Sequence, residues 1–127
     1  MPEFLKAKDV MRLAETHDIV LLFNQFIDDF RYVKSPGEKA ALIEDEPDAD
    51  KLLGGWLCNI AAAVESLAVE AGIEVPGWTQ KQEYFSPVPF YSYDIKNEEF
   101  KEYFKATTPE PFARRNLFPG ENVLSRC

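Results

Sequence analysis

The longest apolar repeat in the sequence runs from Ala49 to Ala71, and it determines the fold class. Apolar residues recur there at intervals of three and four, the spacing of one face of an α-helix, over about six turns. They are Leu53, Trp56, Leu57, Ile60, Val64, Leu67, Ala68 and Ala71. Gly72 follows, and glycine readily adopts the left-handed backbone that ends many helices. We therefore predict a long central helix over residues 49–71.

A second helix is predicted over residues 19–33. Its apolar side chains repeat at helical spacing, whereas the charged residues 28, 29 and 31 fall on the other side. The apolar set is Ile19, Leu22, Phe23, Phe26, Ile27, Phe30 and Val33. A shorter apolar stripe over residues 10–14 has a different phase. We therefore expect a break near residues 16–18, with Thr16 as the N-cap of the second helix.

A helix-start signal stands at Ser35-Pro36-Gly37-Glu38. Ser35 can act as the N-cap, Pro36 suits the first helical position, and Glu38 can complete a capping box. These residues predict a short helix that ends at about Glu44. The following run to Asp50 is too acidic to be buried, so we expect a solvated turn there.

Prolines change the character of the chain over residues 73–94. Pro76, Pro87 and Pro89 cannot lie in helix interiors, and each favours an extended conformation in the residue before it. We expect this segment to wrap across the helices, with its aromatic rings against them and their polar atoms in water. The sequence thus predicts an irregular strap, rich in proline and aromatic residues, around the central helix.

Two further helices are predicted near the C-terminal end. Residues 97–105 have helical spacing and present Phe100, Tyr103 and Phe104 on one face. Thr107 or Thr108, followed by a proline, is expected to open a last helix that carries residues 114 and 115. Together these patterns predict an all-α protein, a single small helical domain spanning residues 1–127.

Composition limits the function classes. The 14 basic and 22 acidic residues leave a net charge of −8, which argues against direct nucleic-acid binding. The excess acid lies in residues 1–50, with six basic and twelve acidic side chains. The N-terminal residues resemble no signal peptide, and the longest apolar runs are too short to cross a membrane. We expect a cytoplasmic protein without membrane association.

Residues that could perform catalysis are scarce. His17 is the single histidine of the sequence. Cys58 lies within the predicted central helix, where we expect it to be a small buried apolar residue. The two cysteines and the histidine have no spacing that would hold zinc, and Asp48 with Asp50 does not continue into a calcium-binding loop. Glycine-rich phosphate-binding motifs are also absent from the sequence. We therefore expect neither a metal nor a cofactor.

Five residues remain as candidates for binding. Arg114 and Arg115 can hold a phosphate or carboxylate through paired hydrogen bonds, or can form salt bridges with the acidic surface of this protein itself. Trp78, Tyr84 and Tyr91 belong to the aromatic strap, which is either a cover for the core or a surface that faces a protein partner. Both alternatives are open for each group.

The C-terminal region also resembles a known family. The segment Gly72-Ile73-Glu74-Val75-Pro76-Gly77-Trp78 and the tail Pro109-Glu110-Pro111-Phe112-Ala113-Arg114-Arg115-Asn116-Leu117-Phe118 are similar to those of small uncharacterised bacterial proteins. The resemblance covers about residue 18 to the end, and its most specific part is the tail. It implies an association with gene neighbourhoods of toxin–antitoxin type, and it identifies no catalytic residue.

The sequence thus favours a non-enzymatic protein-interaction or regulatory module of a bacterial cytoplasmic system, with an antitoxin-like role as one form. We expect a protein partner, for which the acidic N-terminal half favours a basic one. The sequence also leaves open that the partner is a second copy of this chain in a homodimer. The alternative is a small enzyme or toxin component, with a site formed by Arg114, Arg115 and helix carboxylates.

Overall fold

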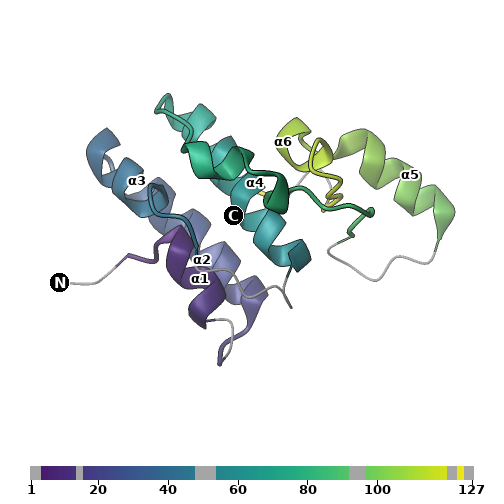
Figure 1. The fold of residues 1–127 in the computed structure, drawn as a ribbon, viewed down its shortest axis with the longest axis horizontal. Coiled ribbons are helices and arrows are strands. Elements are labelled where there is room, and N and C mark those ends of the chain that lie inside the picture. Colours follow the sequence, from purple (N-terminus) through teal and green to yellow (C-terminus); the bar gives the residue numbers. More distant parts are fainter. Residues whose placement is uncertain (1–3, 14–15, 48–53, 92–96, 120–122, 125–127) are drawn as a thin grey trace.

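The computed structural model describes residues 4–13, 16–47, 54–91, 97–119 and 123–124. Within these ranges the protein is a small all-α domain with no β-strand, as the sequence predicts. Its α-helices are α1 (Ala7–Leu13), α2 (Ile19–Tyr32), α3 (Pro36–Ile43), α4 (Gly54–Ala71), α5 (Glu98–Thr107) and α6 (Glu110–Ala113). Two 3-10 helices, η2 (Gly77–Gln80) and η3 (Gln82–Tyr84), lie between α4 and α5 (Figure 1).

The central helix α4 contacts most of the other elements. It packs against α1, α2 and α3 on one side and against η2, η3 and α6 on the other. Every side chain from Leu57 to Glu65 is buried, and the small residues 61–63 are fully so. Neighbouring elements can approach closely at these alanines. The predicted long helix is present from Gly54 onward, and its predicted first residues, 49–53, lie outside the described residues.

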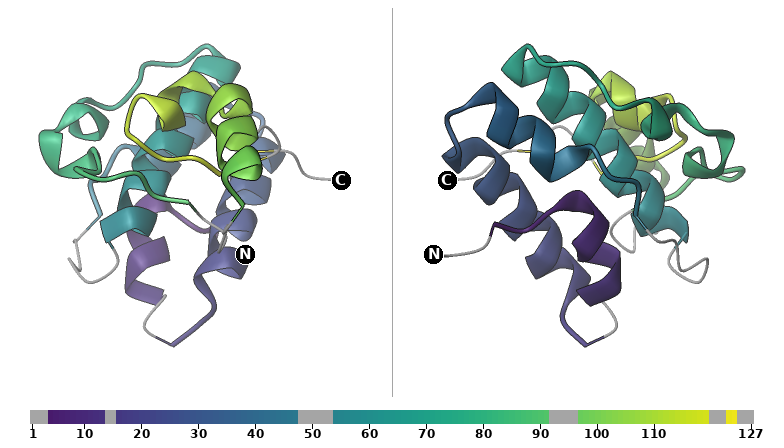
Figure 2. Two further views of the ribbon diagram at one scale, coloured as in Figure 1. Left: turned by 90° about the vertical axis from the view of Figure 1, so that its right-hand side faces the viewer. Right: turned by 60° about the vertical axis from the view of Figure 1, so that its left-hand side comes forward.

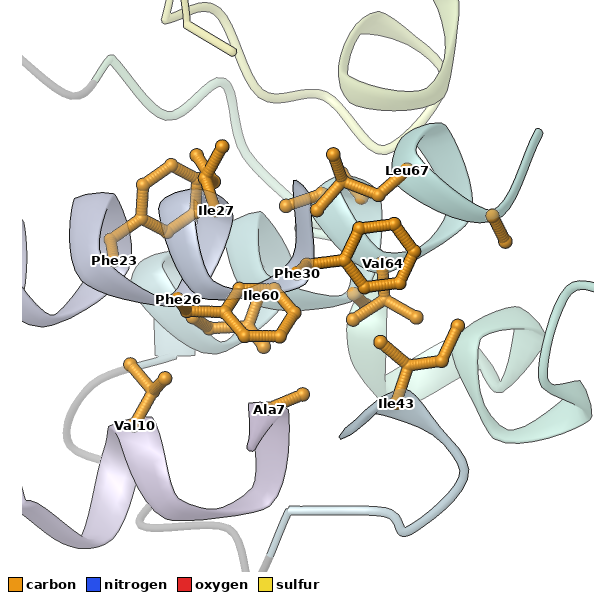
Figure 3. Packing of buried hydrophobic residues seen from close by; sticks show 14 of the residues in the cluster. Ala7, Val10, Phe23, Phe26, Ile27, Phe30, Ile43, Ile60, Val64 and Leu67 are labelled. Carbon is orange, nitrogen blue, oxygen red and sulfur yellow. The ribbon is translucent and has the colours of Figure 1, made fainter. Parts of the chain in front are cut away.

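The hydrophobic core fills the space between α2 and α4. Figure 3 shows the apolar side chains of α2 facing those of α4, with α1 and α3 closing the core from below. Phe26 and Phe30 are fully buried, and burial of one such ring contributes about 1.5–3 kcal/mol. The structure therefore confirms the buried face predicted for residues 19–33.

A break separates α1 from α2 where it is predicted, but a different residue caps the second helix. Asp18, not Thr16, is the N-cap of α2, and its Oδ1 accepts hydrogen bonds from the amides of Val20 (2.8 Å) and Leu21 (3.4 Å). The Thr16 hydroxyl lies 2.9 Å from Nδ1 of His17 instead. The prediction of Thr16 was wrong because the helix begins later, at Ile19, where the Asp18 carboxylate reaches its free amides.

Ser35 is the N-cap of α3 and Pro36 stands in its first turn, as predicted, although the Ser35 hydroxyl makes no hydrogen bond to that turn, all of which the structure describes. The prediction that Thr107 or Thr108 opens the last helix was wrong. The hydroxyls of Thr107 and Thr108 donate backwards, to the carbonyls of Tyr103 (2.8 Å) and Phe104 (2.6 Å). These threonines therefore end α5 and do not open α6, whose N-cap is a proline.

The strap, defined here as residues 73–91, crosses α4 and is bonded to the C-terminal tail. The amide of Ser86 donates to the carbonyl of Arg115 (3.0 Å), and the amide of Phe90 donates to that of Asn116 (2.9 Å). The amide of Phe118 in turn donates to the carbonyl of Phe90 (2.8 Å). Asn116 has a φ of 68°, the left-handed conformation that asparagine tolerates and that reverses the chain after α6. The strap and tail thus cover α4 as one unit.

Candidate functional site

The structure places four of the five candidate residues inside the protein or at its internal contacts. Arg115 and Tyr84 are fully buried, Trp78 is almost so, and Arg114 lies beside Arg115 at the end of α6. Helix α6 ends at Ala113, so both arginines follow the helix on which they were predicted. The expectation that the strap aromatics keep their polar atoms in water is therefore wrong for Trp78 and Tyr84.

Arg115 joins three separate segments around α4. Its Nη2 donates to Oε1 of Glu65 on α4 and to the carbonyl of Thr79 in η2, both at 2.8 Å. Its Nη1 donates to the carbonyl of Pro111 in α6 at 2.8 Å. The guanidinium also lies over the ring of Phe85, 4.9 Å from its centroid. One buried side chain thus connects α4, the strap and α6.

Glu65 is the acceptor at the centre of this group. Besides Arg115, its Oε1 accepts hydrogen bonds from Arg114 and from Nε2 of Gln80 (2.8 Å). Burial would raise the pKa of the Glu65 carboxyl, but the bonds from Gln80 and Arg115 and the two arginine charges outweigh it. Its pKa is therefore held below the ordinary value, and the carboxylate stays ionised. Of the two readings of the arginine pair, the geometry supports an internal salt bridge.

A second polar group anchors the strap to the loop after α3. The hydroxyl of Tyr84 donates to Oε2 of Glu46 at 2.7 Å, and Nζ of Lys81 lies 2.6 Å from Oε1 of the same carboxylate. Nε1 of Trp78 donates to the carbonyl of Ile43 at 3.0 Å, and the Trp78 and Tyr84 rings meet edge to face at 5.2 Å. These two aromatic residues therefore serve as a cover for the core.

The ionisation of this second group follows from its contacts. The hydrogen bond from Lys81, and then that from Tyr84, lowers the pKa of the Glu46 carboxyl. Burial, together with the bond to Glu46, strongly raises the pKa of the Tyr84 hydroxyl. Tyr84 therefore keeps its proton and acts as a donor, which suits a structural contact and not an acid–base role.

Tyr91, the fifth candidate, lies where the tail meets α5. Its ring is half-buried and 5.5 Å from that of Phe118, and Nζ of Lys101 lies 5.7 Å from the Tyr91 centroid. Tyr91 therefore contacts α5 through Lys101, on a helix that buries none of its residues.

Helix α5 presents a partly exposed aromatic surface. We define the α5 aromatic face as Phe100, Tyr103 and Phe104; Phe100 is 61% exposed and Tyr103 49%. None of the ten residues of α5 is buried. Asn97 caps the helix through its Oδ1, which accepts from the amides of Glu99 (2.8 Å) and Phe100 (3.4 Å). Figure 1 shows α5 at the edge of the molecule, beyond α6 and away from α1 to α3, and in the left view of Figure 2 it faces the viewer.

Sequence reasoning missed Glu65 and did not select the α5 aromatic face as a binding surface. A signal for Glu65 exists: it is the single charged residue between Lys51 and Glu70, within the most apolar stretch of the chain. A single charged side chain within a predicted buried helix needs a partner of opposite charge in the interior. The signal for α5 was its aromatic stripe, but spacing alone does not reveal whether another element covers it.

The other reactive residues have contacts that suit structural roles. Burial raises the pKa of the Cys58 thiol, which keeps it in the less nucleophilic protonated form. His17 lies exposed at the break between α1 and α2. Among the described residues, no three histidine, cysteine or acidic side chains gather closely enough to hold a metal ion. The helices in the same ranges include none with the length and apolarity needed to span a membrane.

Comparisons of the chain with protein-family models, with curated proteins and with solved structures gave no match.

Proposed function

We propose that this protein is a non-enzymatic protein-interaction module and that it contacts its partner through the α5 aromatic face. The observation that carries the proposal is the exposure of Phe100 and Tyr103 on a capped helix that buries no residue of its own. Exposed aromatic residues grouped on one helical face are typical of helix-mediated recognition.

The length of α5 supports this proposal. An isolated helix of fewer than about 12–15 residues is marginally stable in water, and α5 has ten. Helices of this size are usually stabilised by packing their apolar face, but here Phe100 and Tyr103 remain 61% and 49% exposed. A partner that covers the exposed parts of these two rings would add apolar contact. Aromatic residues also supply much of the binding energy in protein interfaces.

The arginine pair supports a binding role for the protein over an enzymatic one. Arg115 donates to three acceptors inside the protein, and both arginines share Glu65. An active site built from the pair would first have to break these bonds, because Arg115 has no exposed surface.

Charge favours a basic partner. The net charge of −8 attracts positively charged proteins and accelerates their association. The first turn of α5 adds Glu98 and Glu99 beside the aromatic face. The resemblance of the tail suggests one form of this function, an antitoxin-like regulator of a basic toxin in a bacterial cytoplasm.

The proposal is tested by affinity capture from the native host with the purified protein as bait. We compare the parent with the double variant Phe100→Ser with Tyr103→Ser. The expected result is a stoichiometric protein partner that the parent retains and the double variant loses. Binding of that partner is then measured by calorimetry with both forms.

The matched control is Leu21→Ser with Tyr32→Ser on α2. These residues are 68% and 72% exposed, so the control removes a similar exposed apolar surface elsewhere. It should retain the partner. Equal loss with both double variants, or equal binding by all three proteins, would contradict the assignment to α5. A second copy of the chain is also detectable here: sedimentation would show a parent dimer that the α5 variant lacks.

A further inference from the structure

A groove lies between α3 and the first residues of the strap, at the opposite end of the molecule from α5 (Figure 1). Its volume is about 380 Å³, and it is open to solvent. The apolar part of its lining comes from Ala40 and Ile43 on one side and from Val75 and Trp78 on the other. This volume is at the small end of the range of about 300–1,000 Å³ for ligand pockets, so it suits a single long side chain.

Two carboxylates belong to the lining of this apolar groove. Glu44 lies at the C-terminal end of α3 and Glu74 lies in the strap, and both are exposed. Neither carboxylate forms an ion pair or a hydrogen bond with any residue that the structure describes, and the residues that line the groove include no lysine or arginine.

Neighbouring acidic residues differ in this respect. Asp45 pairs with Lys8 at 3.2 Å, Glu46 pairs with Lys81, and Glu70 pairs with Arg31 at 2.9 Å. The acids that flank Glu44 and Glu74 along the chain thus each have a basic partner, whereas the two that line the groove have none among the described residues. Their combined field favours a cation in the groove.

The groove is also held in shape before any ligand arrives. Nε1 of Trp78 donates to the carbonyl of Ile43 at 3.0 Å, which joins the two walls directly. A binding surface that is already fixed loses less conformational entropy when it is occupied.

We propose that this groove binds a long basic side chain, lysine or arginine, presented by an extended segment of a partner protein. The aliphatic part of that side chain lies along the apolar lining, and its charged end lies near Glu44 and Glu74. An open groove covers only one side of its occupant, so the flanking backbone of the segment supplies additional contact. The site goes beyond the proposed function of α5, because it shares no residue with the α5 aromatic face.

The test uses the full ¹⁵N-labelled chain and the capped peptide Gly-Leu-Arg-Leu-Gly. The indole N–H resonance of Trp78 reports binding, and a Trp56→Phe variant assigns it among the two tryptophans. The expected result is a saturable shift of the Trp78 resonance. The same peptide with neutral citrulline in place of arginine should bind roughly tenfold more weakly, because it lacks the charge. Agmatine, a small guanidinium compound without the flanking residues, should also bind roughly tenfold more weakly than the arginine peptide.

Two variants locate the binding. The double variant Glu44→Gln with Glu74→Gln should bind the arginine peptide roughly tenfold more weakly than the parent. The control Glu99→Gln with Glu102→Gln removes the same charge from α5 and should leave binding within about twofold. Gly77→Leu adds bulk to the groove wall at a position where an added Cβ meets no atom within 4 Å, so it should block binding and retain the fold.

Several results would overturn the proposal. One is an arginine peptide that leaves the Trp78 resonance unmoved. Another is an equal loss of peptide affinity in the groove variant and in the α5 charge variant, which would mean that the peptide is attracted to the acidic surface in general. Agmatine that binds as tightly as the peptide would show that the groove takes a small free cation and not a protein segment.

Discussion

Helices α4 and α5 both carry apolar residues at helical spacing, but their surroundings are opposite. In α4 every side chain from Leu57 to Glu65 is buried, whereas α5 buries none of its ten residues. The periodicity of apolar residues identifies a helical face, but only the surrounding elements decide whether that face becomes core. In this protein the buried side chains of α4 stabilise the fold, and the exposed aromatic residues of α5 form the surface that we assign to a partner.

The polar residues show the same contrast in reverse. Arg115 and Glu65 look like surface residues by type, yet they lie inside, where they connect α4, the strap and α6. Phe100 looks like a core residue by type, yet it is exposed. Residues whose burial is opposite to their polarity therefore mark two sites. The buried Arg115–Glu65 pair holds the fold together, and the exposed Phe100 belongs to the surface that we assign to a partner.

The largest effect is expected from Glu65→Ala. This change leaves the buried guanidinium of Arg115 without its carboxylate, and removing one partner of a buried ion pair costs about 3–5 kcal/mol. Urea unfolding of the variant measures the loss. The matched control is Glu70→Ala on the same helix, which breaks an exposed pair with Arg31 and should cost about 0–1 kcal/mol. Equal losses in the two variants would show that the internal arginine pair is not structural.

Truncation of the α4 core is expected to have the next largest effect. Leu57→Ala removes a buried side chain and should lower the free energy of unfolding by about 2–5 kcal/mol. The exposed Leu21→Ala on α2 should change it by less than about 0.5 kcal/mol. A denaturant midpoint of the Leu57 variant equal to that of the parent would show that α4 is not the centre of the core.

Acid should weaken the contacts between the strap and the rest of the fold. The pKa values of Glu65 and Glu46 are lowered in the folded protein from the ordinary 4.5, so the unfolded chain binds more protons as the pH falls. Their stabilising contribution is present above about pH 4.5 and is lost as the pH falls through the lower folded values. Urea midpoints measured from neutral pH down to about pH 3 should decline. The Glu46→Gln variant should show a smaller drop in urea midpoint with acid than the parent. A drop equal to that of the parent would show that Glu46 does not contribute to the acid sensitivity.

The smallest effect on stability is expected at the α5 aromatic face. Phe100→Ala and Tyr103→Ala should each change the free energy of unfolding by less than about 1 kcal/mol, because about half or more of each residue is exposed. Thermal unfolding of the purified variants checks this. A loss of 2 kcal/mol or more, roughly that of a buried ring, would mean that the face is covered in the free protein.

The helical spacing of residues 19–33 and 54–71 was sufficient to predict the core, because each apolar face meets another apolar face. The prolines of residues 73–91 were sufficient to predict the strap. Neither pattern could locate Arg115, since two of its three acceptors, Glu65 and the carbonyl of Thr79, lie 50 and 36 residues away along the chain. The capping error at Thr16 has a similar origin: several polar residues stand in a row, and the backbone geometry selects Asp18.

The central claim is that α4 forms the core while the exposed aromatic residues of α5 become buried only against a partner, and hydrogen–deuterium exchange tests this most directly. In the free protein, the α4 amides should exchange only through global unfolding, and the α5 amides should exchange much faster through local opening. Addition of the captured partner should slow exchange in α5 and leave α4 unchanged. Amides of α5 that are already as protected as those of α4 in the free protein, or that stay equally fast in the complex, would contradict the account.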